Sequence, residues 1–342
     1  MGEKGSGAQT RRTLVGSPSY LAFLSTIEPH NVNQASKDEC WIQAMNEEFD
    51  QIEKNHTWEL VPRPHDKNVI GTKWIFKNKL NENGDVIRNK ARFVCKGYAK
   101  KEGIYFEETF SHIARLEAIR MFLAFSSFQQ FKVYQMDVKL SFLNGDLEEE
   151  VYIEQPEGFI LGNDEKLVCK LKKALYGLKQ APRAWCYHLD KYLQQQGFTK
   201  GSTDSNLYTK IENDKLLIIV VYVDDNIFGS NEESMSQKFS YVMQQEFEMS
   251  LLGELIYFLG LQVQQATYGI FLSQAKYLKQ ILKKYGMEDC KPMSTLMLTG
   301  CNLSSHDDSP MVNQPEYRSM IGSLLYLTGT RPDIMHAVGI VG

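Results

Sequence analysis

Two adjacent aspartates, Asp224 and Asp225, directly follow an unbroken apolar run of eight residues, Leu216–Val223. A run of that length and composition predicts a buried strand, and it is too short to span a bilayer. Residues 226–229 can return as a second strand, which would place the two carboxylates at a hairpin tip. Burying two like charges there is costly without a cation. A solvated turn that happens to hold two acids is the ordinary alternative.

A third carboxylate ends another predicted strand, because Asp137 lies near the end of FKVYQMDV, residues 131–138. If both strands belong to one sheet, the three carboxylates converge on one edge of it. Carboxylate oxygens suit hard divalent cations such as Mg²⁺. Two such ions about 3.5–4 Å apart can activate an attacking hydroxyl and stabilise a leaving pyrophosphate. The pattern therefore indicates phosphoryl transfer.

The charge of the chain is distributed unevenly. Its net charge of −4 argues by itself against nucleic acid as a partner. Residues 67–101, however, carry a local charge of +8. A basic strip on an acidic body can follow a phosphate backbone, and a solvated basic surface is the alternative. The cations fall at alternate positions of two predicted strands, 68–80 and 86–98, which flank a turn at Asn83-Gly84. These cations are Lys73, Lys77 and Lys79 in the first strand and Arg88, Lys90, Arg92 and Lys96 in the second.

Predicted helices and strands mix without regular alternation along the chain, which favours an α+β fold. Trp41, Met45 and Phe49 recur at helical spacing, so an amphipathic helix is predicted at 36–54. Residues 287–316 hold Pro, Ser, Asp and Asn and predict a linker. Further helices are predicted at 116–129, 181–196, 232–247, 275–285 and 317–328, and further strands at 149–154, 167–172, 255–264 and 269–273.

Residues 222–225 read YVDD, and this tetrapeptide is similar to the YxDD box of the reverse transcriptases of copia-type retrotransposons. Residues 135–145 resemble the first catalytic motif of that family, and LYGLKQAPRAW, residues 175–185, resembles its nucleotide-pocket motif. The likeness extends over residues 36–340, and the order of so many motifs identifies the family. Further matches are VIGTKWIFKNK (69–79), RNKARFVCKGY (88–98), EEVYIEQPEGF (149–159), GELIYFLGLQV (253–263) and SLLYLTGTRPDI (323–334).

The resemblance implies a right-hand polymerase with fingers, a palm and a thumb. The palm is expected to be a ferredoxin-like antiparallel sheet with helices on one face. By this reading, residues 1–35 are a disordered or extended segment, and 36–130 are the fingers and the start of the palm. Residues 131–250 are the palm with the catalytic carboxylates, and 251–290 are the primer grip and thumb. Residues 291–342 are a linker and the start of a truncated connection region.

The resemblance also assigns roles to individual residues. Asp137, Asp224 and Asp225 would be the catalytic metal ligands, with Asp225 in a weaker, supporting role because neighbouring side chains on a strand diverge. Phe142 would be the gate that closes against a ribose 2′-OH. Lys90 and Arg92 are candidates for the incoming triphosphate, and which of the two makes the contact stays open at this point. Tyr176, Gly177, Gln180, Ala181 and Pro182 would line the nucleotide pocket, and Phe258, Leu259 and Gly260 would form the primer grip.

The expected cofactors are two Mg²⁺ ions, for which Mn²⁺ can substitute. The expected partners are an RNA or DNA template with its primer and deoxynucleoside triphosphates, with no membrane. An intracellular location is expected, in cytoplasmic element particles or in the nucleus. We find no acidic set of the kind that an RNase H region carries, so the chain is expected to be a fragment, a domain or a truncated copy.

Two residues beside the predicted metal ligands depart from the family pattern. Leu140 stands where a small residue is usual, and Asn226 where an apolar residue is usual. A buried amide on the return strand needs a hydrogen-bond partner. The leading hypothesis is an RNA-directed DNA polymerase. The alternatives are a catalytically silent remnant that still binds nucleic acid and, less favoured, a metal-dependent nuclease, which would leave the nucleotide-pocket motif without a use.

Overall fold

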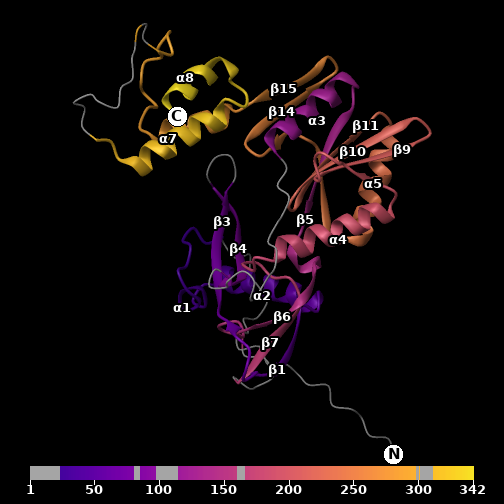
Figure 1. The fold of residues 1–342 in the computed structure, drawn as a ribbon. Coiled ribbons are helices and arrows are strands. Elements are labelled where there is room, and N and C mark those ends of the chain that lie inside the picture. The colour runs from indigo at the N-terminus through magenta and orange to yellow at the C-terminus, as the bar shows by residue number, and fades with distance from the viewer. Residues whose placement is uncertain (1–23, 81–84, 98–114, 160–165, 298–299, 301–310) are drawn as a thin grey trace, which may run out of the picture.

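The computed structural model describes residues 24–80, 85–97, 115–159, 166–297, 300 and 311–342. Its elements form an N-terminal lobe, a central six-stranded sheet with the helices packed on it, and a C-terminal group of helices (Figure 1). Helices and strands mix without regular alternation, as predicted for the α+β class. None of the described helices is long and apolar enough to cross a membrane.

The N-terminal lobe is built around helix α2 (Glu39–Lys54). Asp38 caps this helix by accepting a hydrogen bond from the Cys40 N–H, so it begins three residues after the predicted start at 36. Trp41, Met45 and Phe49 are fully buried against two small sheets. One sheet has the order β1-β7-β6-β2, and the other is the hairpin β3–β4. The bounds are β1 Trp58–Pro62, β2 Val69–Ile70, β3 Thr72–Leu80, β4 Val86–Cys95, β6 Asp146–Ile153 and β7 Leu167–Lys173.

The hairpin β3–β4 confirms the predicted basic pair of strands. Lys77 lies opposite Lys90 and Lys79 lies opposite Arg88, so the cations share one face. The apolar residues of the other face, including Trp74, pack in the core of the lobe. The predicted turn at 83–84 lies outside the described residues.

The prediction of a disordered or extended segment at 1–35 is wrong at its end. Residues 1–23 lie outside the described part of the chain, but helix α1 (Val32–Ala35) is formed and its two end residues are buried. Asn31 caps it by accepting a hydrogen bond from the Gln34 N–H. Helix α1 packs in the same core as helix α2. The polar composition of the surrounding segment gave no indication of this packing.

The central sheet has the strand order β12-β5-β11-β10-β9-β8, and all its pairs are antiparallel. The apolar strand β10 lies near its middle and is buried over most of its length, as the run 216–223 predicts. Strand β12 was not predicted. The bounds are β5 Lys132–Val138, β8 Thr199–Lys200, β9 Leu207–Glu212, β10 Lys215–Tyr222, β11 Asp225–Ser230 and β12 Met249–Glu254.

Helices cover both faces of the central sheet, so the prediction of helices on one face only is wrong. Helices α4 (Ala181–Gln195) and α5 (Glu233–Glu246) pack on the face that carries Met136 and Phe228. Helix α3 (Leu116–Phe128) packs on the opposite face, which carries Val133 and Ile227. The strands of the sheet are apolar on both faces, and this is the pattern that requires two covering layers.

The lobes do not follow the predicted division of the sequence at 130 and 250. Strands β6 and β7, from the predicted palm segment, complete the sheet of the N-terminal lobe. Helix α3, from the predicted fingers segment, packs on the central sheet. The chain therefore passes from one lobe to the other more than once.

A three-stranded sheet and the C-terminal helices complete the structure. Helices α6, α7 and α8 share a small hydrophobic core. Its buried residues include Leu327 of α7 and Val338 of α8. The linker was predicted to extend to residue 316 and the next helix to begin at 317. In the structure Asn313 caps α7, so this helix begins three residues earlier than predicted. Helix α8 was not predicted. The bounds are β13 Tyr257–Phe258, β14 Leu261–Ala266, β15 Gly269–Ser273, α6 Ala275–Lys284, α7 Gln314–Leu327 and α8 Met335–Val341.

Candidate active site

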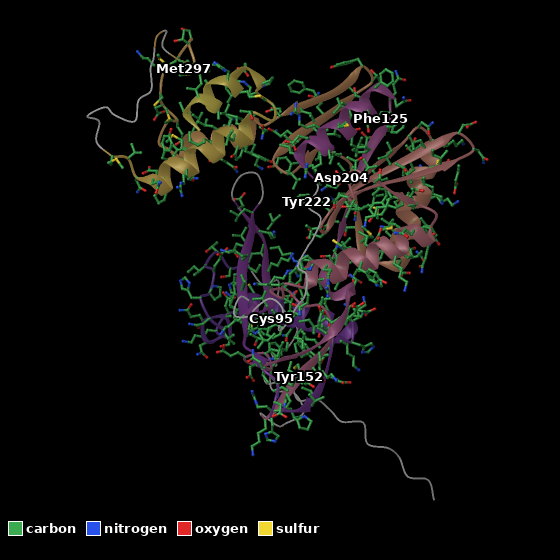
Figure 2. The ribbon with its side chains drawn as sticks, in the orientation of Figure 1. Cys95, Phe125, Tyr152, Asp204, Tyr222 and Met297 are labelled. Atoms are coloured by element: carbon green, nitrogen blue, oxygen red, sulfur yellow. The ribbon has the colours of Figure 1, made fainter. Side chains whose placement is uncertain are left out.

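Two of the three predicted carboxylates, those of Asp224 and Asp225, lie at the turn between β10 and β11. Tyr222 and Asp225 are the last cross-strand pair, so Val223 and Asp224 form the turn (Figure 2 labels Tyr222 at the end of β10). Val223 has a φ of 57°, which is strained for a β-branched residue. Two hydrogen bonds hold the turn: the Trp185 indole N–H donates to the Val223 carbonyl at 2.6 Å, and the Val138 N–H donates to the Asp224 carbonyl at 2.9 Å.

Asp137 and Asp225 lie directly opposite each other on the paired strands β5 and β11. Side chains of directly opposite residues point to the same face of a sheet, so the two carboxylates are neighbours. Gln135, two residues before Asp137, shares that face and donates from Nε2 to Asp225 Oδ1 at 3.0 Å. The structure therefore pairs Asp137 with Asp225, whereas the sequence reading had ranked Asp225 below Asp224.

The two paired carboxylates are destabilised in their charged form. Burial and then the charges of Asp225 and Asp224 raise the pKa of Asp137 to about 6. Lys90 and Arg92 act in the opposite direction on the same carboxyl. Burial, with the charge of Asp224 adding to it, also raises the pKa of Asp225, against the hydrogen bond from Gln135. A cation bound here would relieve a repulsion that the protein only partly offsets.

The carboxylates suit a divalent ion by their chemistry, but they do not form a ready-made metal cluster. Within the described residues, no three His, Cys, Asp or Glu side chains lie close enough together to hold a metal ion. The predicted convergence of Asp137, Asp224 and Asp225 is corrected in this respect. Asp225 instead accepts a hydrogen bond from the amide of Gln135.

The two candidate phosphate-binding cations differ in their surroundings. Arg92 forms an ion pair with Glu48, with Nη1 2.8 Å from Oε2. No ion pair of Lys90 is found among the described residues. Burial and the neighbouring charge of Arg92 lower the pKa of Lys90 to about 8. Lys90 is therefore the cation left available beside Asp137.

The candidate gate Phe142 is packed against another predicted pocket residue. It lies in the 3₁₀ helix η2 (Ser141–Asn144), directly after Leu140, whose φ is 52°. Its ring centroid is 4.8 Å from that of Tyr176, and the Arg92 guanidinium lies 4.6 Å from the same Tyr176 ring. Burial raises the pKa of Tyr176 to about 12, so its hydroxyl is neutral at physiological pH. The structure brings these two predicted residues together.

The other residues predicted to line the pocket lie in the loop before α4 and in its first turn. Gly177 has a φ of 88°, and a Cβ there would lie 2.1 Å from the Cys95 carbonyl oxygen. Its predicted role was close approach of a ligand, whereas the observed close approach is to the backbone of β4. Gln180 is fully buried, and neither polar atom of its side chain has a partner in the described structure. Ala181 and Pro182 begin α4, as predicted.

The predicted primer-grip residues form the hairpin tip between β13 and β14. Phe258 is 2% exposed and belongs to the core beneath the central sheet. Leu259 and Gly260 both have positive φ and make the two-residue turn. The Tyr326 hydroxyl of helix α7 donates to the Leu259 carbonyl. The turn is thus joined to the C-terminal helices.

Sequence reasoning missed three residues that position the site. Gln135 was detectable, because a spacing of two places it on the same strand face as Asp137. Trp185 lies in the predicted nucleotide-pocket motif, residues 175–185, but its hydrogen bond to Val223 joins segments that are 38 residues apart in the sequence. Glu48 gave no local indication, since its partner Arg92 lies 44 residues along the chain.

Comparisons with known proteins agree on one family. A family model described as "Reverse transcriptase (RNA-dependent DNA polymerase)" matches residues 55–299. The chain is 39% identical over 325 residues to the retrovirus-related Pol polyprotein from transposon RE1 of Arabidopsis thaliana, covering 94% of this chain and 22% of that protein. It is 38% identical over 340 residues to the Pol polyprotein from transposon TNT 1-94 of Nicotiana tabacum, covering 95% of this chain and 26% of that protein. The chain thus spans about a quarter or less of the length of these relatives.

A weaker likeness is found among solved structures. A foamy viral protease–reverse transcriptase in complex with double-stranded DNA aligns with 93% of this chain and 44% of its own. The identity is 13% and the TM-score is 0.42.

Proposed function

Because the chain belongs to the reverse transcriptase (RNA-dependent DNA polymerase) family, in its copia-type retrotransposon branch, we propose that it adds deoxynucleotides to a primer on an RNA or DNA template. The observation that carries the proposal is the placement of Asp137 on β5 directly opposite Asp225, beside Asp224 in the β10–β11 turn and within electrostatic reach of Lys90 and Arg92. Phosphoryl transfer needs positioning and charge neutralisation more than covalent chemistry, so this set is sufficient.

The lobes are assigned accordingly. The N-terminal lobe would be the fingers, the central sheet with α3, α4 and α5 the palm, and the C-terminal helices the thumb. The hairpin β3–β4 would lie over the incoming nucleotide, since the charges of Lys90 and Arg92 act on Asp137. This assignment joins strands β6 and β7 to the fingers, as their sheet does.

The aspartates would hold two Mg²⁺ ions. When bound, these ions would activate the primer hydroxyl and neutralise the leaving pyrophosphate. The raised pKa values of Asp137 and Asp225 support this assignment, because they mark carboxylates that lack a compensating charge. Gln135 would orient Asp225, and Trp185 would hold the strained turn in place.

The nucleotide would lie beside the face of the hairpin β3–β4 that carries Lys90 and Arg92. Lys90 would contact the triphosphate, since no carboxylate among the described residues forms an ion pair with it. The buried, unpartnered amide of Gln180 has an NH₂ group that can donate and a carbonyl that can accept a hydrogen bond from a ligand. Phe142, supported by Tyr176, would close against a ribose 2′-OH.

The template and primer would be bound mainly through their phosphates. The exposed face of β3–β4 and the exposed lysines of α6 carry cations without base-reading groups. Such contacts give affinity that falls steeply with salt and does not depend on sequence. The α6 lysines are Lys276, Lys279, Lys283 and Lys284.

Primer extension on poly-rA with an oligo-dT primer and Mg²⁺ tests the proposal. The wild-type chain should incorporate dTTP, and Asp224→Asn should reduce the rate. A metal site contributes several kcal/mol, which corresponds to roughly a hundredfold or more in rate. Asp214→Asn is the matched control, because Asp214 lies at the turn before β10, at its other end.

Two outcomes would reject the proposal that the chain is a DNA polymerase. One is no incorporation by the wild-type chain, and the other is undiminished incorporation by Asp224→Asn. Salt-dependent binding to the primer–template without extension would support the silent, nucleic-acid-binding remnant instead.

A further inference from the structure

We infer that Glu48 is a positioning residue that sets the place of the candidate ribose gate through Arg92 and Tyr176. The inference rests on the proposed function, because it concerns the choice between deoxynucleotides and ribonucleotides. Glu48 lies in helix α2, outside the segment that matches the family model.

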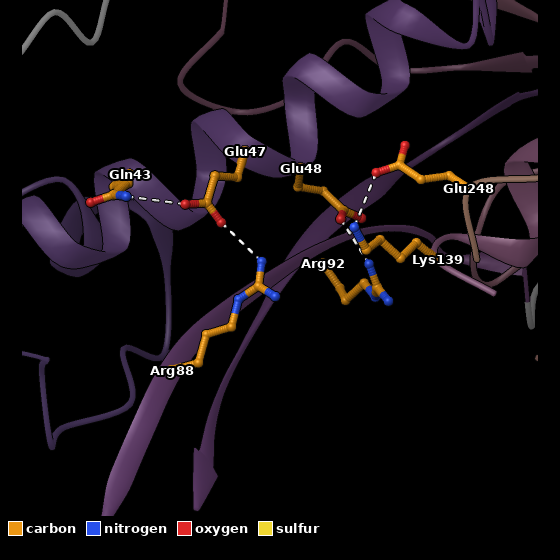
Figure 3. Close-up of polar contacts among 7 residues, drawn as sticks. All are labelled: Gln43, Glu47, Glu48, Arg88, Arg92, Lys139 and Glu248. Carbon is orange, nitrogen blue, oxygen red and sulfur yellow. Dashed lines mark hydrogen bonds and ion pairs between the residues drawn. The ribbon is translucent and has the colours of Figure 1, made fainter. Parts of the chain in front are cut away.

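Glu48 is a buried acid with both oxygens engaged. Its side chain is 5% exposed, and Oε2 lies 2.8 Å from Arg92 Nη1. Oε1 accepts a hydrogen bond from the Phe93 N–H at 3.4 Å. The buried carboxylate therefore holds the guanidinium by charge, as Figure 3 shows. The backbone N–H of Phe93 in β4 in turn holds the carboxylate. A pair held in this way has little freedom to move.

The guanidinium passes this fixed position on to the gate. Arg92 lies 4.6 Å from the centre of the Tyr176 ring, a cation–π contact. The Tyr176 ring in turn lies 4.8 Å from that of Phe142, at an angle of 55°. Glu48, Arg92, Tyr176 and Phe142 thus form one line of contacts from helix α2 to the gate. None of these contacts passes through the three aspartates.

The adjacent residue of the same helix provides a natural contrast. Glu47 pairs with Arg88, the cation four residues before Arg92 on the same strand, at 3.0 Å. These two side chains are 47% and 64% exposed, and Figure 3 shows the two pairs side by side. Among the ring contacts of the described residues, Arg88 has none to Tyr176. Loss of the Glu47 pair should therefore leave the gate in place.

The expected consequence of losing the Glu48 carboxylate is a looser gate. The guanidinium of Arg92 could then move to other hydrogen-bond partners. Tyr176 would lose the cation that is stacked on its ring. Phe142 would then yield more easily to a 2′-OH. A merely structural role would lower incorporation of both sugars together, whereas loss of gate positioning changes their ratio.

The test compares kcat/KM for dUTP with that for UTP on poly-rA with an oligo-dT primer, since the two nucleotides differ only in the 2′-OH. Glu48→Gln should lower the dUTP preference about tenfold, as small misplacements at a reacting site do. Glu47→Gln should keep the wild-type preference, and Phe142→Ala should show the largest fall. An unchanged preference in Glu48→Gln, or an equal fall in Glu47→Gln, would overturn the inference.

Glu48→Asp keeps the charge that Arg92 requires and serves if the Gln variant does not fold. The shorter side chain should give a preference between those of the wild type and Phe142→Ala. A wild-type preference in Glu48→Asp, with the Gln variant unfolded, would also overturn the inference. A wild-type chain that incorporates no dUTP refutes the proposed function together with the inference, whereas an active chain with unchanged preferences refutes the inference alone.

Discussion

Replacing Asn226 by valine should stabilise the protein. Asn226 is 1% exposed, and neither its Nδ2 nor its Oδ1 has a hydrogen-bond partner among the described residues. Its cross-strand neighbours are Val221 and Met136, both buried and apolar. A buried polar group without a partner costs roughly 1–3 kcal/mol. Asn226→Val removes two such groups from an apolar site, so the free energy of unfolding should rise by about 2 kcal/mol.

Urea denaturation followed by circular dichroism measures this change. The midpoint should rise without a change in slope, because the surface exposed on unfolding is nearly the same. The melting temperature should rise by about 4 °C. The matched control is Asn89→Val, since Asn89 is also a buried strand asparagine but donates to Ser25 O at 2.7 Å and to Asn78 Oδ1 at 2.6 Å. That variant should lose stability, and a loss in Asn226→Val as well would refute the reasoning.

The other predictions concern the site. The pKa of Asp137 is raised to about 6 in the metal-free site, so protonation competes with the metal and the affinity for Mn²⁺ should fall as the pH falls through about 6; an affinity independent of pH between 5 and 7 would contradict this. Trp185→Phe removes the bond to Val223 and should lower the extension rate by at least about tenfold. Trp41→Phe, which loses a similar bond to a backbone carbonyl far from the site, should not. Gly177→Ala should lower the free energy of unfolding by about 2–4 kcal/mol, from the strained φ and the contact with β4; a melting temperature equal to that of the wild type would count against it.

Local sequence patterns predicted most of the helices and three strands of the central sheet, β5, β10 and β11, but not β8 or β9. Apolar periodicity placed α2, α3, α4 and α5 to within a few residues, because each helix buries one continuous stripe. Strand β12 was missed, since Met249–Glu254 lacks clear alternation and pairs with β5 across a bulge. Its conformation depends on a partner more than 100 residues away, which no local pattern records.

The candidate site was predictable in its composition but not in its pairing. The three aspartates were identified from strand ends, and Asp224 and Asp225 were expected at a hairpin tip, where Asp224 lies in the turn and Asp225 starts β11. That Asp225 lies directly opposite Asp137 required the register of β5 and β11, which no local pattern gives. The sequence alone showed that Asn226 departs from the family pattern. Only the fold shows that its side chain has no hydrogen-bond partner among the described residues. The role of Glu48 likewise depends on a contact between a helix and a strand that only packing creates.

The central claim is that Asp137 on β5, together with the aspartates of the β10–β11 turn, holds divalent cations. Binding of Mn²⁺ to the full chain, followed by electron paramagnetic resonance without nucleic acid, tests it most directly. The wild-type chain and Asp214→Asn should bind Mn²⁺ with equal affinity. Asp137→Asn should bind at least about tenfold more weakly, because it removes a ligand and the charge that favours the ion. Equal binding by the wild type and Asp137→Asn, or no binding by the wild type, would contradict the account.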